Sequence, residues 1–495
     1  MALEYIDKDN IKKIYDYLLA STPFAADQDE YVYVLRTAFK FCMKVEEYFL
    51  ALRVAMKLDD QVLVEQSFNE CKDPLLKKQL AFSLGRQRLV VDTTDEELTE
   101  IMSNSKLSEF YLKLVKDLDI EKPKHPDDIY KAHLDNKVSK EDLESLQHNL
   151  AMTYTNAFVN IASTKDTLMS AKDPWISHVR NEGILAATAS IGMINLWNVE
   201  ESTSAISDYL DLKDGWAKAG ACIGIGIANS GIWSEVDPAK AILEENLDSK
   251  EPCVKMGAAM GLGMAYAGTA REDFRDLLCP IILDMGIGSD TAGFAALSLG
   301  LIFVSKCDEE VVNTLLTTLM QREENELNQV SARFYAIALA LSYLGQQEKC
   351  ETVIETLQAI EHPLARYAEV CVESAAYVGS GNVLKIQELL KKCTPHEEEG
   401  KTLPQSMAVL GIAFIAISEK IGNDMAGRIM NHILQYCDLP VKRAIPIAIG
   451  MLNISNPTIM ATDLLTKLAH DEDKEMSMRA ILSLGLIGLG TNNSR

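Results

Sequence analysis

A short stretch of the sequence, GAAMGLGMAYAG (Gly257 to Gly268), is apolar and dense in glycine and alanine. We interpret it as a helix, although each glycine inside a helix costs about 1 kcal/mol relative to alanine. Something must offset that cost. Small side chains let two backbones approach closely, so this helix is expected to pack tightly against a similar neighbour.

The same kind of stretch recurs along the chain from about residue 186 to residue 490. Nine copies align on one small residue each, and successive copies lie 34 to 40 residues apart. The nine anchors are Gly192, Gly226, Gly263, Gly300, Ala340, Ala376, Gly411, Gly450 and Gly485. The copies at Ala340 and Ala376 match least well. This period is typical of a pair of helices with two short turns, which predicts an all-α solenoid of helix-pair repeats.

Each repeat contains a second, more polar helix, such as the one expected to start at Pro238 with Asp237 as its N-cap. The small helices should form a crowded inner wall, and the bulkier helices should lie outside it. A small inner layer against a larger outer layer curves the stack, so we expect an arc or a toroid.

Three regions follow from this pattern. Residues 1–90 are predicted to be a rod-like N-terminal helical segment, and residues 147–495 the repeat toroid. Residues 91–146 are acidic and less periodic, with a helix-breaking cluster from Pro123 to Asp128, and are predicted to connect the two. Residues 394–406 are predicted to form an exposed loop.

The net charge is −24. An acidic chain is a poor candidate for nucleic-acid binding, which depends on lysine and arginine. Its surface suits a basic protein partner, or it serves solubility alone. No apolar run is long enough to cross a membrane, and the N-terminus does not have the pattern of a signal peptide. The ten cysteines form no C-x-x-C pair, which favours a reducing compartment, the cytosol or the nucleus.

No motif indicates catalysis. The pairs Gly224-x-Gly226 and Gly261-x-Gly263 lie inside the repeated helices, where a dinucleotide-binding loop would need a preceding strand. His396 and His470 have acidic neighbours but no spaced partners for a metal. We therefore expect no enzyme activity, no metal and no cofactor.

The outer helices carry most of the acidic residues. One holds Glu200 and Asp208, the next holds Asp237, Glu244 and Glu245, and a third begins at Asp308, Glu309 and Glu310. Side by side, these helices could form a ridge that binds a small basic protein. The alternative is an ordinary solvated surface.

The repeats resemble proteasome/cyclosome repeats, the helical units of the two largest non-ATPase subunits of the proteasome regulatory particle. Three stretches resemble one branch of that family, subunit 1: ELTEIMSN from Glu97, KPxxPDDIYKxHL from Lys122, and GLGTNN from Gly488. The segment from Gly379 to Lys385 and the run through Leu468 to Asp471 do so as well. Family members extend beyond both ends of this chain.

The resemblance implies a docking platform in the base of the regulatory particle, in the cytoplasm and the nucleus. Its implied partners are ubiquitin chains, ubiquitin-like domains of shuttle receptors, a ubiquitin-specific deubiquitinase and proteasomal ATPase subunits. The family's ubiquitin-contacting helix aligns with Asp308 to Gln321, including Thr314. Of the positions that are acidic in relatives, Glu310 keeps its carboxylate, whereas Thr317 and Gln321 do not.

A second contact implied by the resemblance lies near Glu200, Thr203, Ser207 and Asp208. The alternative family reading is the paralogous large subunit, a structural hub without ubiquitin binding. The KPxxPDDIYK stretch favours the docking subunit over that paralogue.

Overall fold

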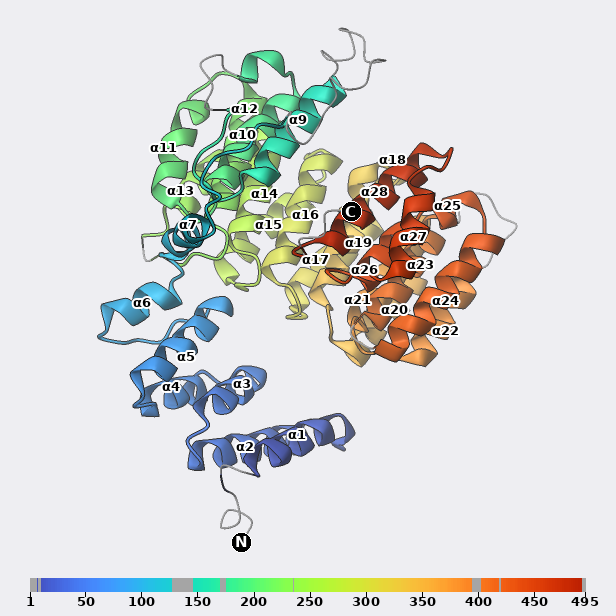
Figure 1. The fold of residues 1–495 in the computed structure, drawn as a ribbon. Coiled ribbons are helices and arrows are strands. Elements are labelled where there is room, and N and C mark those ends of the chain that lie inside the picture. The colour runs from blue at the N-terminus through green and yellow to red at the C-terminus, as the bar shows by residue number, and fades with distance from the viewer. Residues whose placement is uncertain are drawn as a thin grey trace. The chain divides into compact units, whose positions relative to one another are not determined.

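The computed structural model describes residues 7, 10–126, 146–169, 175–234, 236–393, 402–417 and 420–491. Every described element is an α-helix or a short 3-10 helix, which confirms the all-helical prediction. The chain forms two compact units (Figure 1). The first contains residues 1–121 and 231–237, and the second contains residues 122–230 and 238–495.

The first unit is a series of consecutive helices. They are α1 (Ile11–Ser21), α2 (Gln28–Lys44), α3 (Tyr48–Leu58), α4 (Gln61–Glu70), α5 (Pro74–Arg86), α6 (Glu96–Met102) and α7 (Leu107–Asp117). Asp27, Asp60 and Asp73 cap α2, α4 and α5, because each side chain accepts a hydrogen bond from a backbone N–H of the first turn. Leu52 and Phe68 are fully buried in the core.

The boundary of this unit differs from the one expected at residue 90. Helix α6 packs against α5 and buries Leu98, Ile101 and Met102. Residues 91–121 therefore belong with the N-terminal helices rather than to a connection, because a short acidic helix still buries one apolar face. The second unit begins at Lys122, and residues 127–145 lie outside the described part of the chain.

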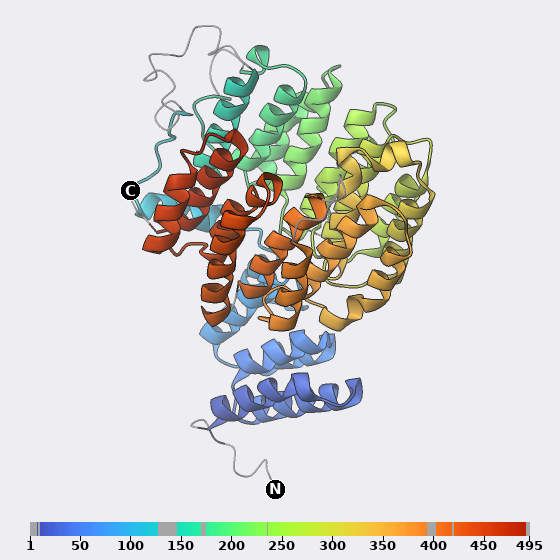
Figure 2. The ribbon, with the colours of Figure 1, turned by 90° about the vertical axis from the view of Figure 1, so that its right-hand side faces the viewer.

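The second unit is a two-layer stack of helices. The inner layer consists of α9 (Leu146–Val159), α10 (Glu182–Ile194), α12 (Gly215–Ala228), α14 (Pro252–Ala265), α16 (Ser289–Ile302), α19 (Arg333–Ser342), α21 (Pro363–Ala376), α23 (Thr402–Ala416), α26 (Ile445–Leu452) and α28 (Lys474–Gly488). Each inner helix packs on the next one in this series. Figure 2 shows several of these helices side by side.

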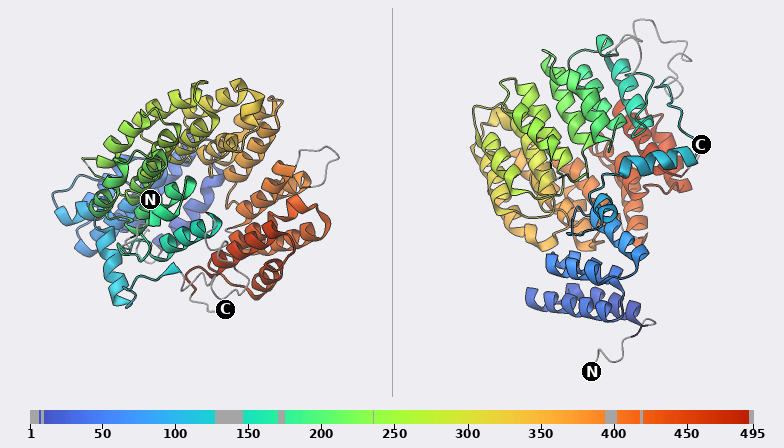
Figure 3. Two further views of the ribbon diagram at one scale, coloured as in Figure 1. Left: turned by 90° about the horizontal axis from the view of Figure 1, so that it is seen from above. Right: turned by 90° about the vertical axis from the view of Figure 1, so that its left-hand side faces the viewer.

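The outer layer alternates with the inner one along the chain. It consists of α11 (Val199–Leu210), α13 (Pro238–Leu247), α15 (Glu272–Leu283), α17 (Glu309–Gln321), α20 (Glu351–Gln358), α22 (Val383–Lys392), α24 (Lys420–Tyr436) and α27 (Ile459–Leu468). Short helices α18 (Glu324–Leu327) and α25 (Leu439–Lys442) occupy two turns, and 3-10 helices span Thr22–Phe24, Trp175–His178, Val330–Ala332 and Gln347–Cys350. The alternation of inner and outer helices, visible in Figure 3, is that of an α-solenoid. Closure of the stack into a toroid stays a prediction.

Several glycines of the inner layer lie at close contacts between backbones. A Cβ atom placed on Gly192 would lie 2.1 Å from the carbonyl oxygen of Gly224, and one on Gly226 would lie 2.3 Å from that of Gly261. The Cβ on Gly300 would lie 2.6 Å from the Cα of Ala338. No side chain fits at such distances, so the predicted role of these glycines in close helix packing is confirmed.

The turn after an inner helix is held by the end of the next inner helix. The backbone N–H of Gly268 donates to the carbonyl of Leu301 at 2.8 Å, that of Ser305 to Leu341 at 2.9 Å, and that of Gly379 to Phe414 at 2.8 Å. These bonds satisfy carbonyls that the last turn of a helix leaves without a partner. The same bond in successive repeats keeps the repeats in register.

The loop predicted at residues 394–406 does not extend to residue 406. Residues 394–401 lie outside the described part of the chain, but α23 already begins at Thr402. Pro404 falls in the first turn of that helix, where the missing N–H breaks no helical hydrogen bond. Its neighbour Gln405 is buried.

Candidate functional site

Helix α17, the predicted contact helix, presents one face to the core and one outward. Asp308 caps it and accepts hydrogen bonds from the backbone N–H groups of Glu310 and Val311 at 3.1 and 3.0 Å. Leu315 and Leu319 are buried on the inner face. The outward positions form what we call the α17 stripe: Glu309, Glu310, Asn313, Thr317, Met320 and Gln321.

Thr314 does not belong to this stripe. Its exposed fraction is 6%, and it lies on the same face as Val311 and Thr318, which are also buried. The side chain of Thr314 is turned toward the core and offers little surface to a partner, and its contact role stays a prediction. The apolar spacing of Val311, Leu315 and Leu319 could have revealed this from the sequence.

Met320 is a member of the stripe that the sequence interpretation missed. Its side chain is 55% exposed, next to the exposed Gln321 and one turn beyond the half-buried Thr317. A thioether on a flexible chain adapts its shape to an apolar partner surface. The stripe thus combines carboxylates at its start with an apolar group at its end.

The acidic start of α17 is partly neutralised by Arg275 on the neighbouring helix α15. The Arg275 guanidinium forms ion pairs with Asp308, at 3.1 Å from Nη1 to Oδ2, and with Glu310, at 3.1 Å from Nε to Oε2. Glu310 remains exposed, whereas Asp308 is largely covered. Sequence reasoning missed Arg275, although its separation from Asp308 of 33 residues is about one repeat.

The same kind of tie joins α13 to α15. Lys240 lies 2.7 Å from Asp273 and 3.5 Å from Glu244, so the predicted site residue Glu244 shares its cation. Burial alone would raise the pKa of Asp273, but hydrogen bonds from Arg271 and Lys240 outweigh burial and lower that pKa to about 2. Glu245 is exposed. The predicted start of this helix at Pro238 is confirmed.

Helix α11 carries the third predicted group. Glu200, Ser207 and Asp208 are exposed, and Thr203 is half-buried. The Thr203 hydroxyl donates to the carbonyl of Val199 at 2.7 Å, and the Ser207 hydroxyl donates to that of Ser204 at 2.9 Å. Both hydroxyls therefore serve their own helix, which leaves the two carboxylates as the groups most available to a partner.

The structure thus distributes the predicted residues rather than gathering them. They lie on α11, α13 and α17, with α15 between the last two in the outer layer, and Asp237 belongs to the first unit. The α17 stripe is the most continuous of these surfaces. Among the described residues, no helix is long and apolar enough to cross a membrane, and no group of His, Cys, Asp or Glu is placed to hold a metal ion. All ten cysteines are free.

Comparison with known proteins finds close relatives of this chain among subunits of the 26S proteasome. A family model described as the RPN1 N-terminal domain matches residues 1–135. The 26S proteasome regulatory subunit rpn1 of Schizosaccharomyces pombe is 42% identical over 99% of this chain and 56% of its own length. The 26S proteasome non-ATPase regulatory subunit 2 of Dictyostelium discoideum is 40% identical over 99% of this chain and 55% of its own.

A plant relative shows the same pattern. Homolog A of 26S proteasome non-ATPase regulatory subunit 2 from Arabidopsis thaliana is 41% identical over 100% of this chain and 58% of its own length. The chain therefore spans just over half the length of these relatives. Its helical stack and this identity along nearly every residue lead to one conclusion: the chain belongs to the family of 26S proteasome regulatory subunits known as rpn1 or non-ATPase subunit 2.

Proposed function

We propose that this chain is a non-catalytic docking scaffold of the proteasome regulatory particle that binds ubiquitin and ubiquitin-like domains through its outer helices. The observation that carries the proposal is the α17 stripe, an exposed helix face with carboxylates at one end and Met320 at the other. Relatives are named as regulatory non-ATPase subunits, which fits a role without catalysis.

The chemistry of the stripe complements that of a ubiquitin fold, whose apolar patch is rimmed by basic residues. Glu309 and Glu310 would face the basic rim, and Met320 would meet the apolar patch. One helix face is a small interface, so affinity for a single ubiquitin should be about micromolar (about −8 kcal/mol) or weaker. Binding several links of a chain at once would raise it.

The test is a titration of ¹⁵N-labelled ubiquitin with the whole chain, followed by NMR. We expect shifts confined to ubiquitin's apolar patch and its basic rim. Glu310→Arg should weaken binding several-fold, because it places a cation against a basic surface. Glu472→Arg is the charge-matched control, since Glu472 is exposed and lies far along the chain from α17. Absence of shifts up to millimolar chain would remove the proposal.

One observation favours a second candidate, a structural hub without ubiquitin binding. Asp308 and Glu310 are already engaged by Arg275, so their charge serves the tie between α15 and α17. If the hub alone is correct, Glu310→Arg lowers the stability of the repeat stack and leaves ubiquitin spectra unchanged. The titration and a thermal melt of the same variant separate the two functions.

The wider partner set belongs to the same proposal. It comprises ubiquitin-like domains of shuttle receptors, a ubiquitin-specific deubiquitinase and proteasomal ATPase subunits, met in the cytoplasm and the nucleus. The acidic outer faces of α11 and α13, with Glu200, Asp208 and Glu245 exposed, offer further surfaces for such basic partners.

A further inference from the structure

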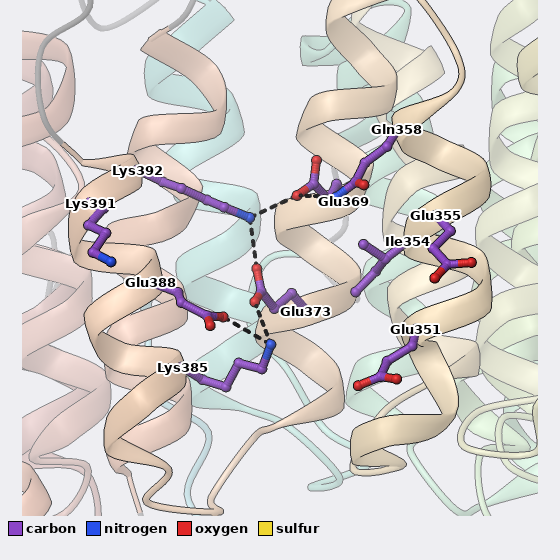
Figure 4. Close-up of a pocket in the computed structure, with 10 residues that line it drawn as sticks. All are labelled: Glu351, Ile354, Glu355, Gln358, Glu369, Glu373, Lys385, Glu388, Lys391 and Lys392. Carbon is purple, nitrogen blue, oxygen red and sulfur yellow. Dashed lines mark hydrogen bonds and ion pairs between the residues drawn. The ribbon is translucent and has the colours of Figure 1, made fainter.

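A groove of about 510 Å³ lies between the outer helices α20 and α22, with the inner helix α21 at its floor (Figure 4). It is a different surface from the α17 stripe. Glu351, Ile354 and Glu355 line it from α20, and Glu369 and Glu373 from α21. Lys385, Glu388, Lys391 and Lys392 line it from α22.

The floor of the groove departs from the repeat pattern. Among the described inner helices, α21 alone carries carboxylates beyond its first turn, at Glu369 and Glu373. Figure 4 shows these two acidic groups on the side of α21 that faces the outer helices. This is the repeat anchored at Ala376, one of the two weakest matches to the glycine-rich pattern.

Lysines of α22 account for part of this negative charge. Glu373 is only 4% exposed, and its two oxygens lie 3.2 Å from the Lys385 ammonium and 2.8 Å from that of Lys392. Lys392 also lies 2.9 Å from Glu369, and Lys385 lies 2.9 Å from Glu388. The pairs with Glu369 and Glu373 fix α22 on α21, and the four pairs together use the charge of both lysines within the molecule.

The α20 side of the groove has no such compensation. Glu351 and Glu355 are exposed, and neither forms an ion pair with any residue that the structure describes. They lie four residues apart on one helix, with the half-buried Ile354 beside them. The groove as a whole holds five carboxylates against three ammonium groups, so it attracts a cation.

We propose that this groove binds a basic segment of a partner protein, with lysine or arginine side chains seated against Glu351 and Glu355. Ile354 would support the aliphatic stem of such a side chain while its charged end meets the carboxylates. The groove's volume lies within the range of protein ligand pockets. The groove suits an acidic segment less well, because two of its three lysines, Lys385 and Lys392, are already held by Glu369, Glu373 and Glu388.

The spacing of the Glu351 and Glu355 carboxylates indicates which kind of basic segment fits the groove. Side chains four apart on a helix have Cβ atoms about 6 Å apart. Alternate residues of an extended peptide lie on one side about 7 Å apart. An extended segment with basic residues at alternate positions therefore matches Glu351 and Glu355 one to one.

The test uses the whole chain and a short fluorescein-labelled peptide with arginine at alternate positions, followed by fluorescence anisotropy. Glu351→Lys with Glu355→Lys should weaken binding by about tenfold or more. The control, Glu361→Lys with Glu472→Lys, changes the net charge equally at exposed positions outside the groove and should weaken binding less than about twofold. The peptide with glutamate in place of arginine should not bind.

Three results would overturn the proposal. One is the absence of peptide binding to the unaltered chain, and another is equal weakening by both charge reversals, which would show a response to net charge alone. The third is displacement of the peptide by saturating ubiquitin, which would assign the groove to the ubiquitin surface. Circular dichroism melts, and the milder pair Glu351→Gln with Glu355→Gln, ensure that lost binding is not lost folding.

Discussion

Replacing Gly226 with alanine adds one methyl group at the closest approach between α12 and α14. The new Cβ would lie 2.3 Å from the carbonyl oxygen of Gly261, 2.6 Å from its Cα and 2.7 Å from its carbonyl carbon. All three are backbone atoms, so no side chain can rotate away. The two helices must separate by about 1 Å to restore ordinary contact.

The two opposing free energies can be compared. Alanine is favoured over glycine inside a helix by about 1 kcal/mol. Overpacking of a close interface costs typically 1–3 kcal/mol and occasionally more. Because the clash is with backbone on three atoms, we place the cost at the upper end and expect a net destabilisation of about 1–2 kcal/mol.

Gly485→Ala is the matched control. Gly485 is the equivalent anchor in α28, but a Cβ there meets no described atom within 4 Å. The same substitution should therefore be neutral or stabilise by up to about 1 kcal/mol. The two glycines share residue type, helix class and repeat position, so only the packing differs.

Native-state hydrogen exchange read by mass spectrometry measures the effect where it arises. Gly226→Ala should raise the exchange of the α12 and α14 amides about tenfold, which corresponds to about 1.4 kcal/mol, while α28 is unchanged. Gly485→Ala should not raise exchange anywhere. If both substitutions shift exchange in the same direction, the explanation of the glycine repeat by close packing is refuted.

Three further outcomes follow from the ion pairs. Asp273→Asn should destabilise by less than about 1 kcal/mol at neutral pH, since the group is partly exposed. Its folded-state pKa is depressed, so this contribution is present above about pH 4 and lost as pH falls toward 2, which urea midpoints against pH would show. Glu373→Gln should lower the free energy of unfolding by about 1–3 kcal/mol, because two ammonium groups lose their buried partner. In the same denaturation assay, Glu388→Gln, at an exposed position, should lower it by under about 0.5 kcal/mol. Arg275→Gln should tighten ubiquitin binding about two- to threefold by releasing Glu310, and an unchanged or weaker affinity in the NMR titration would contradict that reasoning.

The repeat architecture could be predicted from the sequence because its determinants are local and periodic. The spacing of Gly192, Gly226 and Gly263 carries the helix-pair period, and the energetic cost of a helical glycine implies close packing. Both inferences hold in the structure, where the Cβ position of each of these glycines is blocked by the next inner helix.

The candidate site was harder to predict from the sequence, because its charges pair with residues that lie one repeat away in the chain. Arg275 reaches Asp308 and Glu310 across two outer helices, and no local pattern in α17 announces that pairing. The burial of Thr314 and the exposure of Met320 could have been inferred from the helical period of the apolar residues.

The end of the N-terminal helical segment, expected at residue 90 and found at residue 121, was hard to predict for a related reason. Helix α6 has few residues, and its acidic first turn, Glu96 and Glu97, hides the buried face formed by Leu98, Ile101 and Met102. The many acidic residues between positions 91 and 146 therefore indicated a connecting segment. The side-chain pattern of a helix this short carries too little signal to outweigh that count.

We propose that the outward face of α17 binds the partner and that the glycine-rich helices are structural. A photo-crosslinking residue at Asn313, exposed in the middle of the α17 stripe, tests it directly in the presence of ubiquitin. We expect a crosslink from position 313 to ubiquitin's apolar patch or its rim, and none from the exposed control position 361. Equal crosslinking from both positions, or none from position 313, would contradict it.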